Sequence, residues 1–186
     1  TNTRVALINE SYEIIERIQF LTDVDDPDKT MDKIVETISS FKLDIVGVGM
    51  SCPGPLDLIK GKILTTPNLH GKWHDCEISK KLEEKIHIPV YLENDANLAA
   101  LAESIIGEGK AYDYVQYLTV STGLGAGLVI NKKIFIGAHG FANEVANCCM
   151  KHKGPSHGMI YPGGIEAISS GTGIIEQAKK RGLKVE

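Results

Sequence analysis

The segment "LENDANLAALAE", residues 92–103, joins an apolar strand to an alanine-rich helix. The junction carries four polar side chains, Glu93, Asn94, Asp95 and Asn97. Asn and Asp are preferred at helix N-termini because their side chains accept hydrogen bonds from the unpaired N–H groups of the first turn. One residue is enough for that purpose. Capping alone is the simplest interpretation of this stretch, but the surplus of polar groups also predicts a chemical site.

Strands and helices alternate on both sides of this junction. Strands are predicted at 3–8, 13–20 and 43–50, the last one buried, and helical spacing of apolar residues predicts a helix after Asp26 and Pro27 that reaches Phe41. Residues 81–93 add a helix and a strand, 96–106 a helix, and 171–183 another. This alternation predicts an α/β protein with a mixed sheet. We expect a domain boundary near Asp113, with lobes 1–113 and 114–186 and a ligand cleft between them.

The segment "STGLGAG", residues 121–127, contains glycines at alternate positions. A dinucleotide-binding turn would lead into a helix, whereas the residues that follow, "LVINKKIFIG", alternate like a strand. We therefore expect a hairpin turn. Glycine allows close approach of a ligand to backbone N–H groups, so Ser121, Thr122, Gly123, Gly125 and Gly127 could cradle a phosphate. A plain tight hairpin explains the pattern equally well.

Composition restricts the classes of partner. The 186 residues carry a formal net charge of −4, with 42% hydrophobic and 24% charged residues. The chain lacks the excess of basic residues that would attract nucleic acid, and no apolar run is long enough for a membrane helix. We therefore expect a small-molecule partner and a cytoplasmic location. The four cysteines, which lack a regular spacing, are expected to be reduced.

Five segments in register bring a family into view: "PGPLD" (53–57), "TPNL" (66–69), "ENDANLAALAE" (93–103), "STGLGAGLVI" (121–130) and "GAHGFANEVAN" (137–147). Together they resemble the sugar kinases and sugar-responsive repressors of the ROK (repressor, open reading frame, kinase) family, over about residues 3–173. The resemblance implies an actin and hexokinase-like (ribonuclease H-like) α/β fold with two lobes. It also implies phosphoryl transfer from ATP, with Mg²⁺, to a hydroxyl of a hexose or N-acetylhexosamine.

The resemblance also assigns roles to residues. Asp95 matches the catalytic base, and the hairpin glycines match the second phosphate-binding element. The predicted sugar contacts are Asn68, Asn94, Glu144, Asn147 and Glu166. A carboxylate that accepts the proton of a sugar hydroxyl typically contributes 10²- to 10⁴-fold in rate. Carboxamides suit hydroxyl recognition because they offer a donor and an acceptor together.

The sequence departs from the family pattern at the zinc site. Many members carry a histidine three positions after the glutamate, where this chain has Asn147, and a cysteine run that is absent here. A gap-free match puts His157, Met159 and Gly164 at the three cysteine positions, which cannot supply tetrahedral zinc. We expect no structural zinc, although an alternative set can be drawn from four residues: Cys148, Cys149, His152 and His157. Asn147 can still hydrogen-bond a sugar.

The sequence matches only part of the family pattern. The phosphate-loop strand at the start of family kinases and their adenosine-binding region lie outside this sequence, so weak or no turnover is expected of the chain. Three functions remain open: a kinase, the sugar-sensing part of a repressor without kinase activity, and a degenerate paralogue. The identity of the sugar and any homodimerisation are left open.

Residues next to these motifs receive structural interpretations. Trp73 is expected to pack its loop onto the core rather than line a sugar cleft with His74. His139 is expected to be a loop residue without a catalytic role. Pro53 and Gly54 are expected to form a tight turn that brings backbone close to the ligand.

Overall fold

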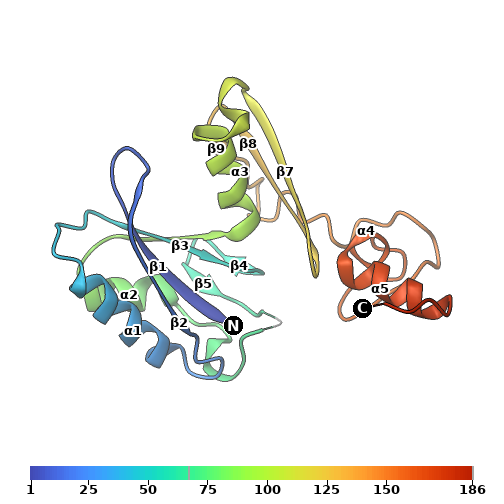
Figure 1. Ribbon diagram of the computed structural model, residues 1–186, viewed down its shortest axis with the longest axis horizontal. Coiled ribbons are helices and arrows are strands. Elements are labelled where there is room, and N and C mark those ends of the chain that lie inside the picture. Colours follow the sequence, from blue (N-terminus) through green and yellow to red (C-terminus); the bar gives the residue numbers. More distant parts are fainter. Residues whose placement is uncertain (67, 186) are drawn as a thin grey trace. The chain divides into compact units, whose positions relative to one another are not determined.

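The computed structural model describes residues 1–66 and 68–185, which form two compact units, Thr1–Asp95 and Ala96–Glu186. Figure 1 labels their helices and strands. The elements of the first unit are β1 (Asn2–Ile8), β2 (Ile14–Leu21), α1 (Pro27–Ser40), β3 (Val48–Cys52), β4 (Leu56–Asp57), β5 (Lys62–Ile63), η1 (Gly71–Trp73), α2 (Ile78–Ile86) and β6 (Val90–Asn94). Those of the second are η2 (Glu108–Ala111), β7 (Tyr114–Val120), β8 (Leu124–Ile130), β9 (Lys133–Ile134), α4 (Ile165–Ser169) and α5 (Gly171–Lys180). Helix α3 (Asp95–Ile105) begins at the division.

The first unit combines antiparallel and parallel pairing. β1 and β2 form an antiparallel hairpin, as do the short β4 and β5, whereas β3 and β6 run parallel in a register from Val48↔Val90 to Cys52↔Asn94. Both kinds of pairing therefore occur in this unit, in separate two-stranded sheets, and the α/β class predicted from the sequence is confirmed. The strand expected at 43–50 begins only at Val48, and Val46 is 91% exposed, so the prediction of a buried strand was wrong at its start. Its pairing partner explains this, because the ladder with β6 begins at Val90.

Helices α1 and α2 supply much of the apolar core of the first unit and lie side by side (Figure 1). α1 starts where the sequence predicts, since the Asp26 carboxylate accepts a hydrogen bond from Asp28 N at 3.1 Å and Pro27 occupies the first turn. Met31 of α1 and Leu82 of α2 are fully buried in one cluster with residues of β3 and β6. The core therefore holds both helices against the parallel strands.

In the second unit β7, β8 and β9 form an antiparallel sheet. The strand–turn–strand prediction for residues 115–130 is confirmed, but β8 begins already at Leu124. The turn is therefore limited to residues 121–123, and Gly125 and Gly127 are strand residues.

Glycines in β8 allow α3 to approach the sheet closely. A Cβ atom built on Gly127 would lie 2.5 Å from Ala96 O, and one on Gly125 would lie 3.4 Å from Ala96 Cβ. No side chain fits at Gly127 without moving the α3 backbone. This packing joins α3 to the second unit, which explains why the compact units divide at Asp95 and Ala96 rather than near Asp113.

The other end of α3 is held by a lysine. Lys132, in the β8–β9 turn with φ +62°, directs its Nζ to four backbone carbonyl oxygens. These are Ser104 O at 2.7 Å, Lys110 O at 2.9 Å, Tyr112 O at 3.0 Å and Gly109 O at 3.4 Å. A cation near a helix C-terminus is favoured by the helix dipole. Lys132 thus fastens the last turn of α3 and η2 to the sheet.

Candidate functional site

Asp95 lies where the parallel strand β6 ends and α3 begins. Asp95 is exposed and occupies the first turn of α3. Asn94 precedes it as the last residue of β6 and is half-buried, whereas Asn97 is only 6% exposed. The polar residues of this junction therefore differ in exposure. Asn97 is buried, whereas Asp95 presents an exposed carboxylate next to the half-buried Asn94 carboxamide.

The loop after β3 lies next to this junction because β3 and β6 are parallel neighbours. Cys52, the last residue of β3, pairs with Asn94, and a Cβ atom on Gly54 would be 3.5 Å from Asn94 Nδ2. The loop backbone, which bends at Gly54, thus approaches the Asn94 carboxamide, and its Gly54–Pro55 peptide bond is cis; the approach of this loop to a ligand stays a prediction. Burial, and secondarily the negative charge of Asp95, raises the pKa of the Cys52 thiol to about 12. The Cys52 thiol is therefore protonated at neutral pH.

Asn68 is exposed on a turn in which Thr66 and Leu69 form a β-bridge. Leu69 N donates to Thr66 Oγ1 at 3.1 Å, which tightens the turn. Pro67 of the "TPNL" motif lies outside the described residues. Asn68, Asn94 and Asp95 all belong to the first unit, and a sugar-binding role for each stays a prediction.

Trp73 packs its loop onto the core, as the sequence predicts. Its side chain is 4% exposed within the main apolar cluster, and its Nε1 donates to Asp23 O at 2.8 Å. The neighbouring His74 is exposed and makes a long contact of 3.4 Å between its Nε2 and Thr65 Oγ1.

In the second unit the β7–β8 turn lies against Glu166 of α4. Leu124 N donates to Glu166 Oε2 at 2.8 Å, and a Cβ atom on Gly123 would lie 2.8 Å from the same oxygen. Gly171 N donates to Ser121 O at 2.7 Å, which joins the turn to the start of α5. The turn is therefore rigid and presents Ser121 and Thr122 as exposed residues.

The predicted phosphate-binding and sugar-binding residues meet at this turn. Gly123 contacts Glu166, and the carboxylate already accepts the Leu124 amide, so Ser121 and Thr122 carry the groups of the turn that are open to a ligand. Gly125 and Gly127 have a packing role that the sequence analysis missed, because alternate glycines fit a ligand-binding loop as well as a close helix contact. A phosphate role for the turn stays a prediction.

The other predicted sugar contacts of the second unit lie in the irregular 135–164 segment, which meets the start of α4 where Glu166 N donates to Ala146 O at 3.1 Å. Glu144 is exposed, and Asn147 is exposed with its Oδ1 accepting a hydrogen bond from Tyr161 N at 2.8 Å. His157 Nε2 lies 3.9 Å from Glu166 Oε1, and both side chains are 16% exposed. His157, at a position where the family pattern has cysteine, thus lies beside Glu166, one of the residues predicted to bind the sugar. His139 is exposed in the loop, as expected.

A zinc site would need several clustered ligands within the part of the chain that the structure describes. No group of three or more His, Cys, Asp or Glu side chains there could hold an ion. Cys148 and Cys149 are exposed free thiols. Within the same residues, no helix is both long enough and apolar enough to cross a membrane.

A groove of about 790 Å³ opens in the first unit between residues 58–61, α2 and β6. None of the predicted site residues lines it. Its walls combine Lys60 and Lys80 with Glu83 and Glu84, so it has no single charge that would select a ligand. We assign it no role.

Comparison with known proteins defines the class of this fold and site. The ROK family model matches residues 1–186, and the chain belongs to the ROK family. The crystal structure of a ROK hexokinase from Thermus thermophilus superposes with a TM-score of 0.88 at 28% identity, covering 100% of this chain and 63% of that one. The fold is therefore the actin and hexokinase-like fold expected from the sequence.

The relatives include both enzymes and regulators. A ROK glucokinase from Streptomyces griseus, crystallised with glucose and AMPPNP, shows a TM-score of 0.79 and 29% identity over 97% of this chain and 58% of that one. A xylose repressor of Bacillus subtilis is 32% identical over 69% of this chain and 35% of the relative. The chain spans about a third to just over half the length of the curated relatives it matches.

Proposed function

We propose that this chain is the sugar-binding and catalytic-base portion of an ATP-dependent carbohydrate kinase. The observation that carries the proposal is Asp95, an exposed carboxylate in the first turn of α3 that directly follows the Asn94 carboxamide. The glucokinase relative crystallised with glucose and AMPPNP supports a hexose and ATP as substrates. The acceptor class is a hexose or an N-acetylhexosamine.

Each residue would have a defined task in such a reaction. The Asp95 carboxylate would accept the proton of the sugar hydroxyl as the hydroxyl oxygen forms a bond to the γ-phosphorus of ATP. The bond from that phosphorus to the β–γ bridging oxygen would break, and ADP would leave. Asn94 and Asn68 would hydrogen-bond other hydroxyls and hold the ring, and we assign the same kind of contact to Glu144, Asn147 and Glu166. Ser121, Thr122 and Gly123 would offer hydroxyl and amide donors to phosphate oxygens.

Magnesium fits this set of residues. Mg²⁺ usually keeps several waters and binds one or two carboxylates together with substrate phosphates, so it needs no cage of protein ligands. Asp95 offers an exposed carboxylate of that kind. When bound with ATP, the ion would offset the charge of the phosphates.

The experiment is sugar-dependent ADP release, measured with glucose, fructose, mannose, N-acetylmannosamine and the pentose xylose, together with sugar binding by thermal shift. Asp95→Asn keeps the size of the side chain but removes the base, so turnover should fall by about 10²- to 10⁴-fold while sugar binding persists. Asp113→Asn is the matched control, since Asp113 is also exposed but belongs to no predicted site. Equal turnover by wild type and Asp95→Asn would disprove the role of the base.

A sugar sensor is the second candidate, and the xylose repressor relative favours it. A sensor would use Asn68, Asn94 and Glu144 for the sugar and would need no phosphate donor. Sugar binding that ATP does not influence would select the sensor. Phosphorylated sugar detected by mass spectrometry would select the kinase.

A further inference from the structure

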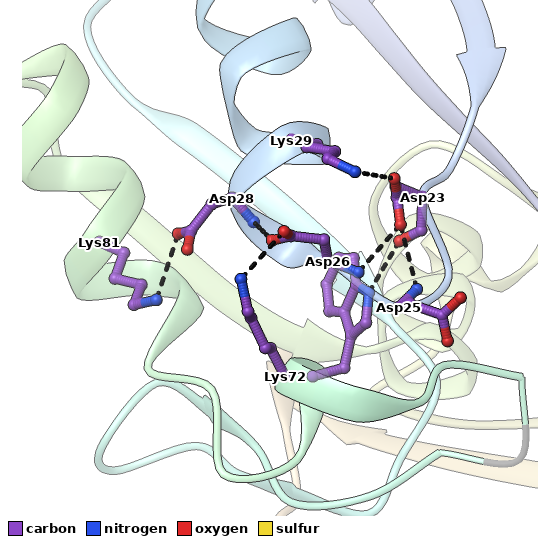
Figure 2. A network of polar contacts seen from close by, with 8 residues as sticks. Asp23, Asp25, Asp26, Asp28, Lys29, Lys72 and Lys81 are labelled. Carbon is purple, nitrogen blue, oxygen red and sulfur yellow. Dashed lines mark hydrogen bonds and ion pairs between the residues drawn. The ribbon is translucent and has the colours of Figure 1, made fainter.

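The acidic segment 22–28, which connects β2 to the first turn of α1, is held by its own hydrogen bonds. The Asp23 carboxylate accepts from Asp25 N at 3.2 Å and Asp26 N at 2.9 Å, and Asp23 N donates to Thr30 Oγ1 at 3.0 Å. Lys29 Nζ lies 3.4 Å from the second Asp23 oxygen. The carboxylates of Asp23 and Asp26 each cap local backbone groups and pair with a lysine, and that of Asp28 pairs with Lys81, whereas Figure 2 draws no contact to the Asp25 carboxylate.

The same segment presents three consecutive backbone carbonyls, those of Asp23, Val24 and Asp25, which we name the carbonyl strip. All three accept hydrogen bonds from the 68–74 loop. Trp73 Nε1 donates to Asp23 O at 2.8 Å, His70 N to Val24 O at 2.7 Å and Lys72 N to Asp25 O at 3.2 Å. A continuous strip thus meets a matching row of donors.

Two further contacts fix the register of this row. Lys72 Nζ donates to Asp26 Oδ2 at 3.0 Å, and the other oxygen of the same carboxylate caps α1 through Asp28 N (Figure 2). Gly71 has φ +55°, and a Cβ atom there would lie 2.9 Å from Asp25 O. Any side chain at position 71 would push the loop off the strip and would also occupy an unfavourable backbone region.

The loop that meets the strip also carries Asn68. Leu69, next to Asn68, is 6% exposed, and His70, which follows it, donates to the strip. Asn68 itself remains exposed on the turn between Thr66 and Leu69. The position of Asn68 within the first unit is therefore set by the hydrogen bonds of residues 70, 72 and 73, which follow it closely in the sequence.

We propose that the carbonyl strip positions Asn68 for sugar binding, so that Gly71 and Trp73 are positioning residues for the sugar site although neither contacts the sugar. The inference rests on the proposed function for its sugar-binding part. Its structural part is independent of any ligand, because hydrogen exchange of the 70 and 72 amides reports the strip directly.

The test compares Gly71→Ala and Trp73→Phe with Gly182→Ala. The control has the same type of backbone conformation, φ +72°, with no atom within 4 Å of its Cβ position, and it lies at the end of α5. Trp73→Phe keeps an aromatic ring in the core but removes the donor to Asp23 O. Hydrogen exchange followed by mass spectrometry reads residues 68–74, and equilibrium dialysis with labelled glucose, mannose and N-acetylmannosamine reads sugar binding.

Exchange in the 68–74 peptide should accelerate about tenfold in Gly71→Ala, less in Trp73→Phe and not at all in the control. The dissociation constant for the bound sugar should rise about fivefold or more in Gly71→Ala, while its midpoint of thermal unfolding stays close to that of the control. That separation distinguishes positioning from a general loss of stability.

Unchanged exchange in both variants would overturn the inference. Faster exchange with unchanged sugar affinity would overturn the positioning of Asn68. If the wild-type chain binds none of the sugars, the proposed function and the sugar-binding part of the inference fail together, and the exchange measurement still decides whether the strip holds the loop.

Discussion

The two units of the molecule bury their cores by different means. The first unit packs large side chains, among them Met31, Ile63 and Leu82, between two helices and the parallel strands. In the second unit the buried apolar residues among those described are small, namely Ala96, Ala100, Ala126, Val129 and Ala167. There α3 meets β8 through backbone contact at glycine. The packing of the first unit therefore depends on large buried side chains. The contact of α3 with β8 in the second unit depends on glycine, which has no side chain.

Removing volume from the first unit should have the largest effect on stability. Leu82→Ala deletes a fully buried side chain of α2 and leaves a cavity, which should lower the free energy of unfolding by about 2–5 kcal/mol. Trp73 is the single tryptophan of the chain, so its fluorescence during urea denaturation follows this unit alone. Lys80→Ala, at an exposed position of the same helix, is the control. Equal midpoints for the two variants would contradict the role assigned to this core.

Adding volume to the second unit should have the next largest effect. Gly127→Ala places a Cβ atom 2.5 Å from Ala96 O and should destabilise the contact of α3 with β8 by about 1–3 kcal/mol. Gly49→Ala is the matched control, because it is also a strand glycine but has no atom within 4 Å of its Cβ position. Hydrogen exchange in α3 provides the measurement. Protection of α3 that remains at the wild-type level would refute the glycine-dependent packing.

Removing the Lys132 ammonium should have a moderate effect on the same unit. Lys132→Met keeps the aliphatic length but leaves four carbonyl oxygens without their shared donor, and we expect a loss of about 1 kcal/mol, since the site is partly open to water. Lys133→Met, at the adjacent exposed position, should change little. Thermal unfolding followed by far-ultraviolet circular dichroism compares the two. Identical midpoints would show that the carbonyl oxygens are satisfied by water.

Acidification should have the smallest effect and should act on the first unit. A hydrogen bond from the Lys72 ammonium holds the pKa of Asp26 below its usual value of 3.8, and the Asp25 amide does the same for Asp23. Both carboxylates therefore contribute stability above pH 3.8, and this contribution is lost as pH falls through their lowered folded-state pKa values. Trp73 fluorescence in urea between pH 2.5 and 7 should show a flatter acid limb for Asp26→Asn. An unchanged acid limb would remove Asp26 from this account.

Local sequence signals predicted elements whose ends are set by their own residues. Asp26 and Pro27 defined the start of α1, and the helix predicted from residue 171 begins at Gly171, where the Ser170 side chain accepts a hydrogen bond from Gly173 N. Strand 43–50 was placed too early because its limits depend on pairing with β6, far away in sequence. The turn in "STGLGAG" was drawn too long for the same reason, since only contact with α3 distinguishes a packed glycine from a ligand-binding one.

The sequence by itself determined the α/β class, the family, the strand-to-helix junction at Asp95 and the predicted site residues, because these depend on residue type, spacing and order along the chain. Only the tertiary structure decided that Gly127 packs against Ala96, that Glu166 accepts the Leu124 amide, that Lys132 reaches four carbonyls, and that the carbonyls of residues 23–25 hold the loop of Asn68. Those contacts join residues that are distant in sequence. Most of them involve backbone N–H and C=O groups, which are the same in nearly every residue, so residue types do not reveal the partners. Their partners become visible only after the chain has folded.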